Sequence, residues 1–78
     1  INLKKEMLSM ENKYEIKITT QDRLLRAWEN SMELVRDFEK YSQEIKDDKE
    51  VARLFAEYAE EEGVHAAKFR ETLYKYQH

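Results

Sequence analysis

The chain has 78 residues, a length that indicates a single domain whose own hydrophobic core gives only marginal stability. It has no cysteine, which excludes disulfides and thiolate metal sites and leaves a metal held by oxygen and nitrogen ligands, or self-association, as added support. Charged residues make up 40% of the chain but the net charge is only -3, because acids and bases are interspersed as on exposed helix faces, and this pattern argues against a nucleic-acid-binding surface.

Residues 1–20 are predicted to form a lead-in to the main domain. Leu3, Met7 and Met10 recur at helical spacings of four and three, which predicts a short amphipathic helix over residues 1–13. The stretch YEIKIT that follows alternates apolar and polar residues. We interpret it as an extended segment that packs along the helices or pairs with its copy in another chain.

A first long helix is predicted over residues 21–46. The chain has no proline and one glycine, a composition that favours long helices. Thr19 and Asp22 have the spacing of a capping box at its start. The apolar residues recur at helical intervals and are Leu24, Trp28, Met32, Val35, Phe38 and Ile45.

A second long helix is predicted over residues 48–76, after the polar break KDDKE. Asp47 and Glu50 have capping-box spacing, and acids suit the positive end of a helix. The connection is short, so the two helices should fold back as an antiparallel hairpin. The sequence therefore predicts an all-α hairpin over residues 21–78.

One face of the second helix carries an apolar stripe with a polar centre. At 100° per residue, the apolar members of the stripe are Val51, Phe55, Tyr58, Phe69, Leu73 and Tyr76. Glu62 and His65 fill the gap between Tyr58 and Phe69 in register. Glu60 and Glu61 project away from the stripe and are interpreted as surface acids.

An acid and an imidazole on such a stripe need partners. A buried ionised carboxylate costs several kcal/mol unless it is paired or coordinated. Glu62 and His65, three residues apart on one face, can bind one ion together, and Glu-x-x-His is the spacing of carboxylate-bridged di-iron sites in four-helix bundles. The alternative is a structural pair, formed with each other or with an arginine, that specifies helix pairing without a metal.

Glu29 is the predicted third ligand. It lies at the edge of the apolar arc of the first helix, and in a hairpin that turns near residues 47 and 48 its level matches that of Glu62 to within about one turn. The alternative for Glu29 is a boundary glutamate that makes surface ion pairs.

Residues 50–69, EVARLFAEYAEEEGVHAAKF, resemble the second helix of the rubrerythrin branch of the ferritin-like superfamily. The resemblance includes the Leu-Phe pair, the alanine spacing and the Glu-x-x-His motif. The 33-residue separation of Glu29 and Glu62 is similar to the corresponding separation in that family. The resemblance is close over residues 50–69 and looser over residues 24–74.

The resemblance implies a dinuclear iron site in a four-helix bundle. Each half of such a bundle supplies one glutamate and one Glu-x-x-His, and this chain has one set, so the resemblance implies a homodimer with Glu29, Glu62 and His65 from each chain. It implies two iron ions per dimer, with manganese or zinc as other possible metals. It also implies redox chemistry with peroxide or oxygen, as in a peroxide reductase or ferroxidase, with electrons from a separate donor protein.

Two further residues are predicted to lie near the site. Tyr58, one turn before Glu62, either hydrogen-bonds a ligand glutamate or packs in the core. Arg36 occupies a position where the family has a tyrosine. A cation there would weaken metal binding or pair with Glu62.

Two other functions are compatible with the sequence. One is a non-catalytic helical dimerisation module, and the other is iron oxidation and storage in a larger assembly. No apolar run reaches the roughly 20 residues of a membrane-spanning helix and no signal-peptide pattern is present, so we expect a cytoplasmic location without membrane contact.

Overall fold

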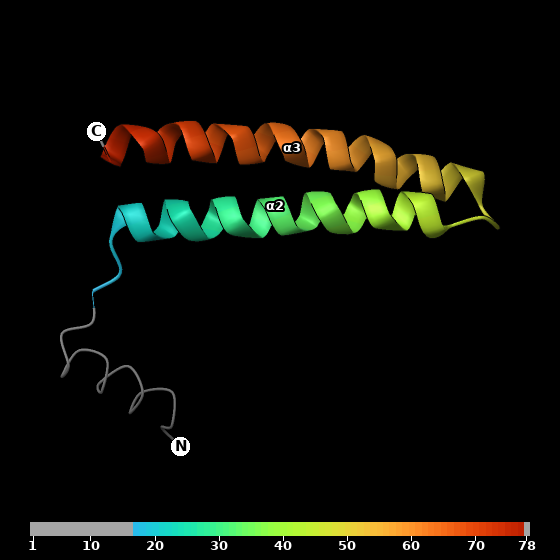
Figure 1. The fold of residues 1–78 in the computed structure, drawn as a ribbon, viewed down its shortest axis with the longest axis horizontal. Helices are drawn as coiled ribbons and strands as arrows, with labels where there is room; N and C mark the ends of the chain where they lie inside the picture. The colour runs from blue at the N-terminus through green and yellow to red at the C-terminus, as the bar shows by residue number, and fades with distance from the viewer. Residues whose placement is uncertain (1–16, 78) are drawn as a thin grey trace, which may run out of the picture.

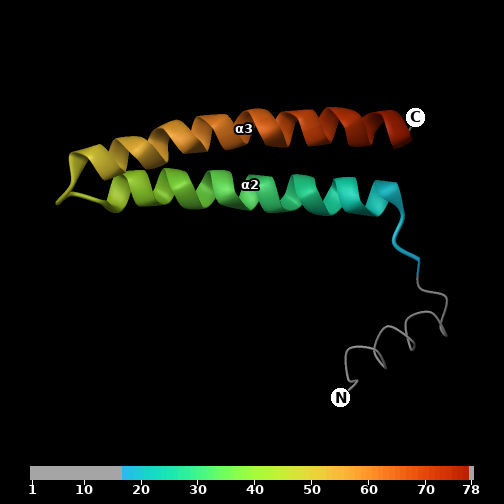
Figure 2. The same ribbon diagram turned by 180° about the vertical axis from the view of Figure 1, so that it is seen from behind.

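The computed structural model describes residues 17–77, and these residues form two helices. Helix α2 spans Thr20–Glu44 and helix α3 spans Lys49–Gln77, and they lie side by side in opposite directions (Figures 1 and 2). The predicted all-helical hairpin is confirmed over this part of the chain, which contains no strand. The predictions for residues 1–16 lie outside the described residues. Neither helix is long and apolar enough to cross a membrane.

The start of α2 is the predicted capping box. The Thr19 hydroxyl accepts a hydrogen bond from the Asp22 amide at 3.0 Å, and the Asp22 carboxylate accepts one from the Thr19 amide, also at 3.0 Å. The hydrogen bond from the Thr19 amide holds the pKa of Asp22 below its ordinary value, and the Thr19 side chain adds to this effect. The box therefore fixes the point at which the chain enters the hairpin.

The start of α3 differs from the prediction by one residue. The Asp48 carboxylate, and not that of Asp47, accepts a hydrogen bond from a helix amide, that of Val51 at 3.1 Å. The expected capping box between Asp47 and Glu50 is therefore wrong. Because the helix begins at Lys49, Asp48 is the residue placed to cap it, and Val51 three residues on has no carboxylate with which to complete a box.

Small side chains line the contact between the two helices. The buried residues are Ser31 of α2 with Ala59, Ala66 and Leu73 of α3, and we call this line of residues the seam. Toward the connecting loop, Phe55 contacts the rings of Phe38 and Tyr41, with centroid distances of 5.6 and 5.3 Å. Among the described residues no large side chain is fully buried, so the hairpin alone has a thin core.

The predicted apolar stripe of α3 is divided by this seam. Phe55, Phe69 and Leu73 are buried or half-buried against α2, whereas Tyr58 and Tyr76 are 47% and 55% exposed. The cause is the course of the seam, which follows Ala59 and Ala66, because small residues allow the closest approach of two helices. The larger stripe residues on one flank of the seam consequently remain open to solvent.

The hairpin has two broad faces, one on each side of the seam. The Tyr41–Phe55 contact lies on one of these sides, which we call the histidine face. At 100° per residue, the α3 residues on this side are Val51, Leu54, Tyr58 and His65. The other side, called the glycine face, is defined by Ala56, Gly63 and Ala67 of α3 together with Trp28 and Met32 of α2.

Candidate metal site

Glu62 lies midway along α3, at the edge of the seam. Its side chain is 19% exposed, so Glu62 is partly shielded from solvent. A hydrogen bond with the Ser31 side chain of α2 lowers the pKa of Glu62, and the neighbouring His65 lowers it further, while burial acts in the opposite direction. The net effect is a lowered pKa, so Glu62 keeps its negative charge at this half-buried position.

His65 is the direct neighbour of Glu62 on the histidine face. Its Nδ1 atom lies 3.2 Å from Oε1 of Glu62, and its side chain is 64% exposed. When Nδ1 carries the proton it donates to the carboxylate, and Nε2 then has a lone pair available to a ligand. Carboxylates orient metal-binding histidines in proteins through this type of contact.

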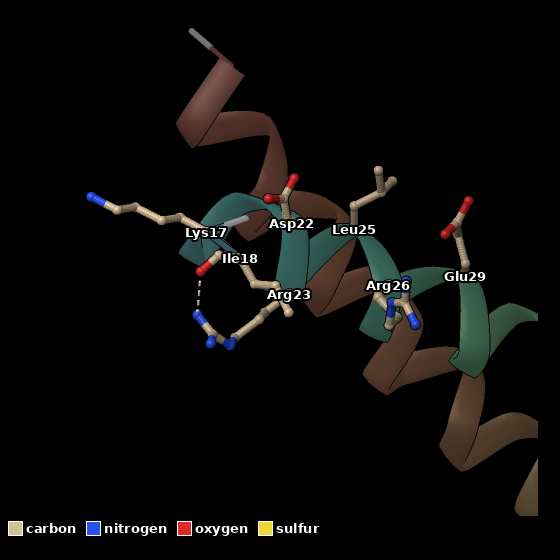
Figure 3. A pocket seen from close by; sticks show the side chains of 7 residues that line it. All are labelled: Lys17, Ile18, Asp22, Arg23, Leu25, Arg26 and Glu29. Atoms are coloured by element: carbon tan, nitrogen blue, oxygen red, sulfur yellow. Dashed lines mark hydrogen bonds between the residues drawn. The ribbon is translucent and has the colours of Figure 1, made fainter. Parts of the chain in front are cut away.

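Glu29 is not brought to this pair within one chain. It lies two residues before Ser31 and is therefore rotated by about 200° around α2 from the side that faces Glu62. Its exposed side chain lines a surface hollow at the start of α2, where it extends to the same side of the helix as Leu25 (Figure 3). Residues 17–76 contain no group of three or more histidine, aspartate or glutamate side chains that could hold a metal ion.

The hollow around Glu29 belongs to the surface of α2. It is lined by Lys17, Ile18, Asp22, Arg23, Leu25, Arg26 and Glu29. Within it the Arg23 guanidinium donates to the carbonyl oxygen of Ile18 at 2.8 Å, which fastens the entering chain to the first turn of the helix (Figure 3). The hollow shares no residue with the Glu62–His65 pair.

The two remaining predicted residues lie on different faces. Arg36 lines a shallow hollow with Trp28, Glu29, Met32 and Glu33, and it is not among the groups that shift the pKa of Glu62. Tyr58 lies one turn before Glu62 on the histidine face and is 47% exposed. Of these two residues, only Tyr58 is close enough to share a partner surface with Glu62 and His65.

Ser31 is the residue that the sequence prediction missed. It is buried to 5% exposure at the seam and is the α2 residue that meets Glu62. The signal was present in the sequence, because Ser31 is a hydroxyl within the apolar arc of α2, between Trp28 and Val35. A projection of both helices about a common contact line would have placed it opposite Glu62.

Comparisons of the chain with protein-family models, with curated proteins and with solved structures found no match. The resemblance to rubrerythrins therefore depends on the motif in residues 50–69. The function is argued below from the contacts of Glu62 and His65.

Proposed function

We propose that this chain is a metal-binding, ferritin-like half-bundle that completes its site by pairing with a second copy of itself. The observation that supports this most directly is the contact between His65 Nδ1 and Glu62 Oε1 at 3.2 Å, at the middle of an amphipathic helix. A carboxylate beside an imidazole suits ferrous iron, manganese or zinc. Glu62 is ionised and His65 is open to the surface, so both can take part in binding an ion from that side.

A second copy supplies the ligands that one chain lacks. One hairpin offers Glu62 and His65, whereas iron and zinc in proteins take four or more ligands. A two-fold axis close to the pair doubles this set to two carboxylates and two imidazoles. Closed two-fold dimers are the commonest protein oligomers, and an interface of this type repeats each contact twice.

The number of ions depends on Glu29. Two carboxylates and two imidazoles provide the four ligands that one ion requires. The two iron ions per dimer implied by the resemblance need further carboxylates, and Glu29 is turned away from the pair in the single hairpin. We therefore propose one ion per dimer from these four ligands, and a second ion only if Glu29 of another copy reaches the site.

The resemblance also supports redox chemistry at this site. A ferrous ion held there would give one electron to peroxide or oxygen as it becomes ferric, and each further electron would come from a donor. The roles of this chain would be to fix the ion through Glu62 and His65 and to limit water access. The chain has no cysteine for an iron–sulfur or rubredoxin-like centre, so we propose that electrons come from a separate protein.

Anaerobic titration with ferrous iron, and in parallel with zinc, tests this function. We expect Glu62→Gln and His65→Gln to reduce metal affinity by at least about 10- to 100-fold, since each removes a binding group while keeping a similar shape. Glu61→Gln is the matched control on the exposed side and should leave affinity unchanged. Equal affinity in all variants would remove the basis of the proposal. Glu29→Gln reports separately on whether a second ion is bound.

A structural role is the second candidate, and the Ser31 contact favours it. The hydrogen bond with Ser31 and the contact with His65 give the Glu62 carboxylate two partners without any metal. Such a pair can specify how helices associate. This alternative predicts that a chelator changes neither the mass in solution nor the melting temperature, whereas the metal proposal predicts that added metal raises the melting temperature.

A further inference from the structure

The histidine face of α3 has a pattern that is nearly the same in both chain directions. Residues equidistant from the point between Gly63 and Val64 form matched pairs, namely Val51 with Tyr76, Phe55 with Thr72, Tyr58 with Phe69 and Glu62 with His65. The outer three pairs are apolar except for Thr72, whose hydroxyl donates to the Lys68 carbonyl within α3 at 2.8 Å. The central pair joins an acid to an imidazole.

We propose that two copies pack through this face, with α3 antiparallel to the partner's α3 about a two-fold axis at that midpoint. Glu62 then lies level with the partner's His65, and Tyr58 lies level with the partner's Phe69. This inference rests on the proposed function for its second copy and deepens it by assigning the face and the register. The midpoint nearly coincides with the centre of Lys49–Gln77, so the two helices overlap over their full length.

Charge complementarity selects the antiparallel register. In a parallel arrangement about the same face, Glu62 would meet the partner's Glu62, and two carboxylates in a partly buried interface repel each other. In the antiparallel arrangement each carboxylate meets an imidazole twice, once in its own chain at 3.2 Å and once across the axis. The central contact therefore favours this register with or without a bound ion.

Apolar area also favours this face. Tyr58, Leu54, Leu34 and Tyr41 remain 47%, 42%, 41% and 41% exposed in a single hairpin, although no large side chain among the described residues is fully buried to stabilise it. Tyr41 marks this face through its contact with Phe55. Leu34 lies seven residues, or about two turns, before Tyr41 and is therefore on the same flank of α2. Covering this face with a second hairpin produces four helices around one apolar core.

Cross-linking tests the register directly, because the natural chain has no cysteine. Single variants Val51→Cys and Tyr76→Cys are prepared, mixed in equal amounts and oxidised, with and without a chelator. We expect a disulfide between the two different variants and none within either variant alone. In the antiparallel register, two copies of position 51 are about 37 Å apart at 1.5 Å per residue, far beyond the roughly 7 Å limit between disulfide-bonded Cα atoms.

The control pair is Ala56→Cys with Arg70→Cys, which has nearly the same midpoint but lies on the glycine face. We expect no cross-link from this pair. Cross-linking of Val51→Cys to itself would show a parallel register, and cross-linking of the control pair would show that the glycine face is the interface. Either result overturns the inference.

The mass in solution is the second measurement. The wild type should have twice the 9.5 kDa of one chain. Tyr58→Glu should shift it to the single-chain mass, whereas Val64→Glu, at a side chain 69% exposed on the outer side of α3, should not. If the cross-link forms in the chelator but no metal binds, the interface stands and the proposed function fails. If metal binds but the cross-link does not form, the proposed function stands and the proposed interface is wrong.

Discussion

Nδ1 of His65 lies 3.2 Å from Oε1 of Glu62, so the acid and the imidazole of the motif are already in contact within one chain. Glu62 lies at the edge of the seam with its side chain 19% exposed, whereas the side chain of His65 is 64% exposed at the surface. On the α2 side, the Ser31 side chain makes a hydrogen bond with Glu62. The site is thus organised before a metal or a second chain is added, which reduces the ordering that binding would require.

Replacement of Ser31 by alanine should destabilise the hairpin. We expect Ser31→Ala to reduce the free energy of unfolding by about 1 kcal/mol, because the half-buried Glu62 carboxylate loses a hydrogen-bond donor. The pKa of Glu62 should rise toward its ordinary value of 4.5. Urea unfolding followed by circular dichroism and an NMR titration measure the two effects.

Ser42 provides the matched control for this substitution. Its hydroxyl donates to the Glu39 carbonyl at 2.9 Å, so this hydrogen bond stays within α2. Ser42→Ala should therefore change the unfolding free energy by less than about 0.5 kcal/mol. Equal losses in the two variants would mean that the contact between Ser31 and Glu62 has no specific role.

Acid should destabilise the folded chain through two carboxylates. The pKa values of Asp22 and Glu62 are both lowered in the folded state, from ordinary values of 3.8 and 4.5. Their contribution to stability is therefore present above those ordinary values and is lost as the pH falls through the lowered folded values. Melting temperatures between pH 7 and pH 2.5 should decline on the acid side, and they should decline less in Ser31→Ala. A melting temperature that rises on acidification would contradict this assignment.

Loss of the Thr19 cap should weaken the start of α2. Thr19→Ala removes the hydroxyl that accepts the Asp22 amide at 3.0 Å, and a lost N-cap typically costs about 1 kcal/mol. Thr19→Ser keeps the hydroxyl and should retain most of the stability. Thermal unfolding compares the two variants, and equal destabilisation by serine and alanine would rule out the cap as the cause.

Alanine at position 63 should stabilise the hairpin. A Cβ atom added at Gly63 meets nothing within 4 Å, and alanine is favoured over glycine in a helix by about 1 kcal/mol. Because Gly63 lies on the glycine face, Gly63→Ala should leave the mass in solution unchanged. A shift to the single-chain mass would indicate that a second copy lies close against Gly63.

The helices and their order could be predicted from the sequence because their ends have local signals. Thr19 and Asp22 fix the first start through contacts three residues apart. The second start was ambiguous, since Asp47 and Asp48 are adjacent acids and only the backbone geometry decides which one caps. The helix itself could be predicted there, but the residue that caps it could not.

The site was harder to predict because it depends on rotation as well as on level. The level of Glu29 along α2 follows from the rise per residue, but the side on which it projects depends on where the seam runs. Ala59 and Ala66 determine that course through close approach, and such small residues give little signal beside the large apolar residues of the stripe. Ser31, and not Glu29, is therefore the α2 residue that meets Glu62.

Native mass spectrometry of the protein loaded anaerobically with ferrous iron tests the central claim most directly. It reports the number of chains and of ions in the same particle. We predict a species of two 9.5 kDa chains with one bound ion, and a Glu62→Gln sample in which two chains remain without the ion. A dimer that stays free of metal at saturating iron, or an ion bound equally well by the Glu62→Gln variant, would contradict the proposed metal site.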